Sequence, residues 1–156
     1  MLYPYWSSLK AVSAPAWLRA GQLCLCSEDP DQSKSRVGID CWLGNRWATQ
    51  KAWALALQIP AIDDPAWRLC PDGALPHARR PVVLALQDSR YGGFRLGCYS
   101  PPTDSFAGGW LLHEAGQWLT LPNESVLGWL TIPQRFSRRL RPPLQASRER
   151  LLANVR

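Results

Sequence analysis

The side chains that could carry out chemistry are few and scattered. His113 stands beside Glu114, which would suit a general base, although a position just before a turn is more typical of a solvent-facing residue. Asp63 and Asp64 are adjacent, so their carboxylates point apart in an extended chain, and we expect them to cap a turn before Pro65. Neither a Gly-x-Ser-x-Gly motif nor a glycine-rich phosphate loop is present. The sequence therefore predicts a protein that is not an enzyme and uses no cofactor.

The five cysteines and two histidines do not form a metal-binding pattern. There is no Cys-x-x-Cys pair, and Cys24 and Cys26 would face the same side of a strand. A disulfide between such close neighbours would be strained. We therefore expect no metal site, and free buried thiols in a reducing compartment. The other cysteines are Cys41, Cys70 and Cys98.

Arginine is concentrated at the C-terminal end of the chain. From Gln134 onward there are seven arginines and one acid, Glu149, so this tail carries the whole net charge of +6. Arginine binds carboxylates and phosphates through paired hydrogen bonds, which makes an acidic protein or a nucleic acid a suitable partner. An apolar stripe over 144–156 also predicts a short helix, which would dock on the body or pair with a second copy. The candidate partner-binding residues are Arg135, Arg138, Arg139, Arg141, Arg148 and Arg150.

The elements that would position these residues differ between the two halves of the chain. In the first half, a capping Ser13 and a closing Gly21 predict a short helix over 13–21. The segments 22–26 and 36–43 then predict a hairpin with a long polar loop.

The segment 44–60 carries two competing patterns. Four alanines and a capping Asn45 favour a helix, whereas apolar residues at every second position favour a strand. The same apolar residues also pair at helical spacing, and we predict a helix over 46–58 that ends before Pro60. The alternating residues are Trp53, Leu55, Leu57 and Ile59.

The second half predicts five strands, at 81–88, 94–100, in a hairpin over 110–121, and at 125–132. Five antiparallel strands in succession predict a small β meander or open barrel. Together with the helices of the other segments, the expected fold class is α+β. No internal repeat is apparent in the sequence.

Several residues of this half follow one another in a set order, namely Trp67, Leu75, Pro76, Pro81 to Leu84, Tyr99, Trp110, Val126, Trp129 and Pro133. This series resembles a small-domain family of phages and prophages, domain of unknown function 551. Members of that family usually have a histidine before the closing tryptophan, where this chain has Gly128. The resemblance covers about 67–133 and implies a mobile-element setting and an accessory role without an assigned activity.

These observations divide the chain into an N-terminal α+β part (1–66), an antiparallel β domain (67–133) and a basic arm (134–156). The leading hypothesis is a non-enzymatic phage or prophage accessory protein that binds a host protein complex, for example as an anti-defence (anti-CRISPR-like) inhibitor. The alternative is a nucleic-acid-binding module that uses the arginine-rich tail. No leader peptide or apolar run of membrane-spanning length is seen, so we expect a location in the cytoplasm of a bacterial host. We expect the protein to be a monomer or a homodimer. Most of the nine tryptophans should fill the core.

Overall fold

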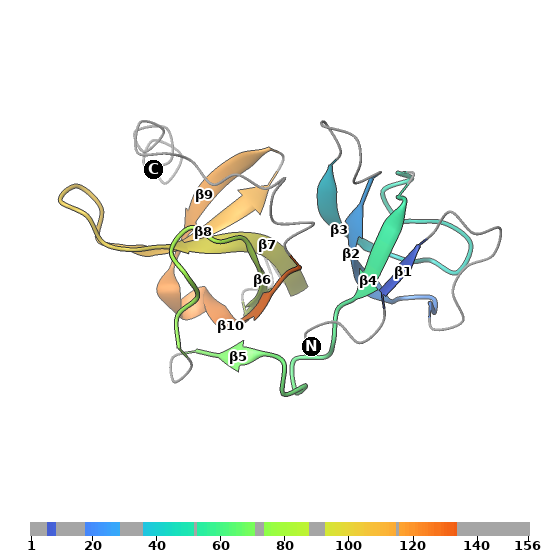
Figure 1. The fold of residues 1–156 in the computed structure, drawn as a ribbon, viewed down its shortest axis with the longest axis horizontal. Coiled ribbons are helices and arrows are strands. Elements are labelled where there is room, and N and C mark those ends of the chain that lie inside the picture. The colour runs from blue at the N-terminus through green and yellow to red at the C-terminus, as the bar shows by residue number, and fades with distance from the viewer. Residues whose placement is uncertain are drawn as a thin grey trace.

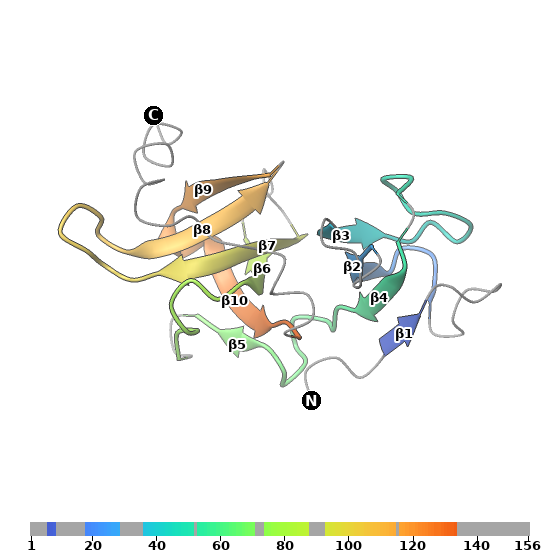
Figure 2. The ribbon, with the colours of Figure 1, turned by 45° about the horizontal axis from the view of Figure 1, so that its top comes forward.

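A computed structural model describes seven parts of the chain, with only the backbone described for 6–8; these parts are 6–8, 18–28, 36–51, 53–70, 74–87, 93–114 and 116–133. Within them the protein is built from ten strands in two antiparallel sheets, which lie side by side in Figures 1 and 2. The one helical element of this part is a single 3₁₀ turn, Asn123–Ser125. The predicted α+β class is therefore wrong, since the described fold is almost entirely β. No helix among the described residues is long and apolar enough to cross a membrane.

The first sheet has the strand order β1-β4-β2-β3. The predicted hairpin is present as β2 and β3, in which Leu25 lies opposite Ile39. The four strands are β1 (Trp6–Ser8), β2 (Leu23–Ser27), β3 (Val37–Cys41) and β4 (Leu55–Gln58).

The helix predicted over 46–58 is wrong, because 55–58 form strand β4 between β1 and β2. A strand in this central place is hydrogen-bonded along both edges and covered on both faces, so tertiary pairing outweighs the helix propensity of the alanines. Ala56 is fully buried against one face and Leu57 is buried against the other. Of the helix predicted over 13–21, residues 18–21 form a turn and 13–17 lie outside the described residues, as does the helix predicted over 144–156.

The second sheet has the order β5-β10-β6-β7-β8-β9. The five strands predicted for this half correspond to β6–β10, but the last one pairs with β6 instead of continuing the meander beyond β9. The six strands are β5 (Arg68–Leu69), β6 (Val82–Leu86), β7 (Gly93–Ser100), β8 (Gly109–Glu114), β9 (Gln117–Leu121) and β10 (Val126–Thr131).

The core is made of four apolar clusters, of which only the first joins the two sheets. The first lies between the sheets and contains Leu25 and Leu57 of one sheet with Val83 and Leu130 of the other. The second fills the far face of the six-stranded sheet, and the third covers the outer face of the four-stranded sheet. Among the seven tryptophans whose side chains are described, six are buried and Trp42 is partly buried, which confirms that most of them serve the core. The six are Trp47, Trp53, Trp67, Trp110, Trp118 and Trp129.

Candidate functional site

The arginines predicted to bind a partner all belong to the C-terminal tail. That tail lies outside the described residues, so its arginines stay predictions. They are Arg135, Arg138, Arg139, Arg141, Arg148 and Arg150.

Two buried thiols, those of Cys24 and Cys98, are poor nucleophiles. Burial raises the pKa of Cys24 to about 12, and the neighbouring Cys41 and Asp40 add to that rise. Burial also raises the pKa of Cys98 to about 12, although the nearby Arg79 guanidinium acts in the opposite direction. Because a thiolate is the reactive form, these cysteines are protonated and unreactive near neutral pH. Cys24 and Cys26 pack in the same cluster on one side of β2, as their spacing predicts.

The histidine and the paired acids have structural positions. The ring of His113 packs on Trp118, with 4.9 Å between ring centroids, and burial lowers its pKa. It is therefore half-buried on the sheet instead of facing solvent before the turn. Asp64 caps a turn, as predicted, by accepting the backbone N–H of Ala66 at 2.8 Å. Among the described residues, no group of three potential metal ligands comes together.

One buried acid fixes the loop that covers the outer face of the first sheet. Asp40 on β3 is 3% exposed. Its Oδ2 accepts a hydrogen bond from the indole N–H of Trp53 at 2.8 Å and another from the hydroxyl of Thr49. Its Oδ1 accepts a hydrogen bond from the backbone N–H of Cys41 at 2.8 Å. A buried carboxylate with several donors is strongly held, so Asp40 clamps the 41–53 segment against β3.

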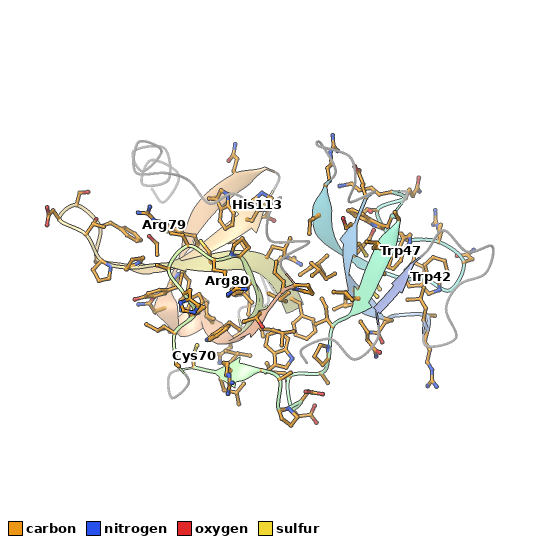
Figure 3. The ribbon with its side chains drawn as sticks, viewed as in Figure 1. Trp42, Trp47, Cys70, Arg79, Arg80 and His113 are labelled. Atoms are coloured by element: carbon orange, nitrogen blue, oxygen red, sulfur yellow. The ribbon has the colours of Figure 1, made fainter. Side chains whose placement is uncertain are left out.

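The clamp supports a small two-tryptophan turn, residues 42–47, which we call the tryptophan hairpin. Trp42 and Trp47 pair as a β-bridge, and their rings meet edge to face with centroids 5.1 Å apart. The turn is closed by a hydrogen bond from the Leu43 N–H to the Arg46 carbonyl at 2.8 Å. Figure 3 shows both indoles on the four-stranded sheet's side of the molecule, whereas His113 lies on the six-stranded sheet. The turn is thus closed by both backbone and ring contacts.

The tip of this hairpin presents an exposed apolar residue near two arginines. Leu43 is 46% exposed, and Arg46 is exposed beside it. A Cβ on Gly44 would lie 3.5 Å from Ala20, so the segment that carries the exposed Arg19 lies against the tip. The exposed Lys51 places its Nζ 5.5 Å from the centre of the Trp53 ring. We call the four residues Arg19, Trp42, Leu43 and Arg46 the hairpin patch.

Within the described parts of 18–60, no free carboxylate stands near the two arginines of the hairpin patch. In the described parts of 18–60 the only acids are Glu28 and Asp40. Glu28 accepts the backbone N–H of Arg36 at 3.2 Å, and Asp40 is buried in the clamp. The positive charge at this end is therefore available to an external acid.

Sequence reasoning missed the hairpin patch because it divided 42–47 between a strand and a helix. The signal was present in the segment Trp-Leu-Gly-Asn-Arg-Trp, in which Gly and Asn stand at the centre of a turn between two aromatic residues. The φ of Gly44 is +101°, a conformation that favours glycine.

Comparisons of the chain with protein-family models, with curated proteins and with solved structures find no match. The resemblance of 67–133 to domain of unknown function 551 therefore stays a prediction.

Proposed function

We propose that this chain is a non-enzymatic accessory protein of a phage or prophage that binds an acidic surface of a host protein complex in the bacterial cytoplasm. One form of such binding is inhibition of a host defence complex. The observation that carries the proposal is the hairpin patch, in which an exposed leucine and a tryptophan stand near two arginines, with no free carboxylate among the described residues of 18–60.

This combination of apolar and cationic side chains suits a protein partner better than a partner that is bound through charge alone. Interface hot spots are enriched in Trp and Arg and are built around an apolar centre with a polar rim. Leu43 would supply the apolar centre, while Arg46 and Arg19 would pair with carboxylates at the rim. The Asp40 clamp adds to the proposal because a turn that is already ordered loses little conformational entropy on binding.

The test is affinity capture of partners from a bacterial lysate treated with nuclease, with two matched double variants. Leu43→Asp with Arg46→Glu reverses the chemistry of the hairpin patch. Leu75→Asp with Arg80→Glu makes the same changes at exposed positions of the other half. We expect the first variant to lose a stoichiometric acidic protein that the parent and the second variant retain. The proposal fails if the parent captures no such protein, or if both variants retain it equally.

A second candidate function is nucleic-acid binding through the tail. The observation that favours it is the seven arginines that follow Gln134. Binding of this kind weakens steeply with salt, with a log–log slope of about −0.9 for each phosphate neutralised on double-stranded DNA. In a capture without nuclease, we would then expect nucleic acid to be retained by the parent. Its loss on changing Arg138, Arg139 and Arg141 to Glu would favour this alternative.

A further inference from the structure

The two sheets share one strand order. In the first, β1 pairs with β4, β4 with β2, and β2 with β3. In the second, β5 pairs with β10, β10 with β6, and β6 with β7, before β8 and β9 extend the sheet. All these pairings are antiparallel. Each run of four strands therefore has the same topology, with β1, β2, β3 and β4 equivalent to β5, β6, β7 and β10.

The registers agree residue by residue. Leu25 lies opposite Leu57 in the first sheet, and Val83 lies opposite Leu130 in the second. On the next pair of strands, Leu25 lies opposite Ile39, and Val83 lies opposite Leu96. The remaining pairs from Cys24 to Ser27 and from Val82 to Ala85 follow the same correspondence, and beyond Gly128 the register of β10 shifts. A shift of one residue would exchange the two faces of a strand, so matching registers over three ladders require the same placement of side chains.

The correspondence also aligns identical residues that lie at different intervals along the chain. The ladders match Cys41 with Cys98 and Leu57 with Leu130, and the adjoining residues match Ile59 with Ile132. They likewise bring Trp6 to the place of Trp67 and Pro60 to that of Pro133.

An aromatic pair after the third strand of each set supports the same correspondence. Trp42 meets Trp47 edge to face with centroids 5.1 Å apart and planes at 68°. Tyr99, which is equivalent to Trp42, meets Trp110 at 5.4 Å and 69°. The segment after Trp47 then turns away at Gln50, whose φ is +60°, whereas the segment after Trp110 continues as β8 and β9. The hairpin of β8 and β9 is thus the main element that one set has and the other lacks.

The cluster between the sheets is made of equivalent residues from both sets. Leu25, Leu57 and Ile59 contribute from the first sheet, and their equivalents Val83, Leu130 and Ile132 contribute from the second. The half-buried Val37 and Phe94 occupy one equivalent position, and the half-buried Ile39 and the buried Leu96 occupy another. A contact in which both partners use the same patch is the isologous contact of two-fold dimers.

We propose that the chain is a tandem duplication of one four-stranded β unit, and that the face covered in each unit is a self-association surface whose partner is a second copy of that unit. Unit one comprises 6–60 and unit two comprises 67–133. The expectation that the sequence holds no internal repeat is replaced by this proposal. Differences between the units are compensated within the face, since Leu55 and Val37 in unit one correspond to Gly128 and Phe94 in unit two.

The test uses the full chain with a protease site inserted between Ile62 and Asp63, which are both exposed in the connection between the units. After cleavage, the two fragments are unfolded in urea, refolded together and examined by native mass spectrometry, so that every pairing can form. We expect a 1:1 complex of the fragments and, beside it, a homodimer of the larger fragment. The proposal is overturned if the larger fragment is found only in the 1:1 complex, or only as a monomer.

Two further variants separate the covered face from the rest of strand β10. Leu130→Asp changes a fully buried residue of the face, whereas Leu127→Asp changes a residue of the same strand that is 39% exposed. Phe94→Ala is a milder change of the face, used if the aspartate variant loses its β circular dichroism. We expect loss of the homodimer with Leu130→Asp or Phe94→Ala, and a change of no more than about twofold with Leu127→Asp. Equal effects of face and control variants would contradict the proposed surface.

Discussion

The buried carboxylate of Asp40 gives the sharpest test of how the first sheet is held together. Replacing it by asparagine keeps the shape of the side chain and removes one acceptor and the charge. The Oδ2 oxygen accepts the indole N–H of Trp53 at 2.8 Å, and Oδ1 accepts the backbone N–H groups of Cys41 at 2.8 Å and of Thr49 at 3.3 Å. An amide group cannot accept at both places, so at least one buried donor loses its partner.

The expected cost follows from that donor. The amide NH₂ is best placed on the Oδ2 side, where the Thr49 hydroxyl can turn to accept it, and the Trp53 N–H is then left without an acceptor. A buried donor without a partner costs about 1–3 kcal/mol, and the lost charge weakens the bonds that remain. We therefore expect Asp40→Asn to lower the free energy of unfolding by about 2–3 kcal/mol. That is a large fraction of the total stability of an ordinary domain.

A double-mutant cycle with Trp53→Phe attributes this cost to its cause. Phenylalanine removes the N–H that asparagine would leave unpaired, so the double variant should be more stable than the two single costs predict, by about 1–2 kcal/mol. The measurement is urea unfolding followed by far-ultraviolet circular dichroism, which does not depend on the fluorescence of the residue changed. Single costs that add to within about 0.5 kcal/mol would refute the clamp.

Four further outcomes are expected. Gly97→Ala should cost about 3 kcal/mol in urea unfolding, because a Cβ there would collide with the carbonyl oxygen of Leu111, whereas Gly116→Ala meets no neighbour and should cost only the strain of its φ of +76°, about 1 kcal/mol. Burial raises the pKa of Cys98 from 9.0 to about 12, so the unfolded thiol ionises first and stability should fall as pH rises from 9 towards 12; a Cys98→Ala variant should lose that part of the pH dependence. Burial lowers the pKa of His113 below 6.5, so stability should fall as pH drops below 6.5, and a pH titration of His113→Phe that still shows the fall would be contrary to this assignment. Changing Arg138, Arg139 and Arg141 to Glu should leave the thermal midpoint unchanged and weaken capture of the partner. A variant that binds like the parent would show that these arginines are not needed and leave the hairpin patch as the binding site.

The strands of the second half could be predicted from the sequence because local chemistry determines them. Apolar β-branched runs such as 81–86 are bounded by turn residues, and a run of that kind is stable only when both faces are covered. The order in which these strands pair could not be predicted in full from the sequence. Whether β10 pairs with β6 or with β9 depends on how the whole sheet curls, and no residue of β10 records that choice.

The candidate site was not predictable from local patterns. Asp40 looks like any polar residue in a strand, and its role as a clamp appears only when Thr49 and Trp53 are brought to it by the fold. The alanines around Ala56 favour a helix in isolation, yet β4 is extended because two neighbouring strands supply its hydrogen-bond partners.

The sequence by itself determined where the extended apolar segments of the second half lie and that the positive charge is gathered in the tail, since both are properties of short stretches of chain. Only the tertiary structure decided which segments are equivalent. The matching residues, such as Leu57 and Leu130, are few and separated by loops of different length, so a linear comparison does not align them. Hydrogen-bonded ladders do align them, because each strand can satisfy its backbone and cover its apolar face in one register only.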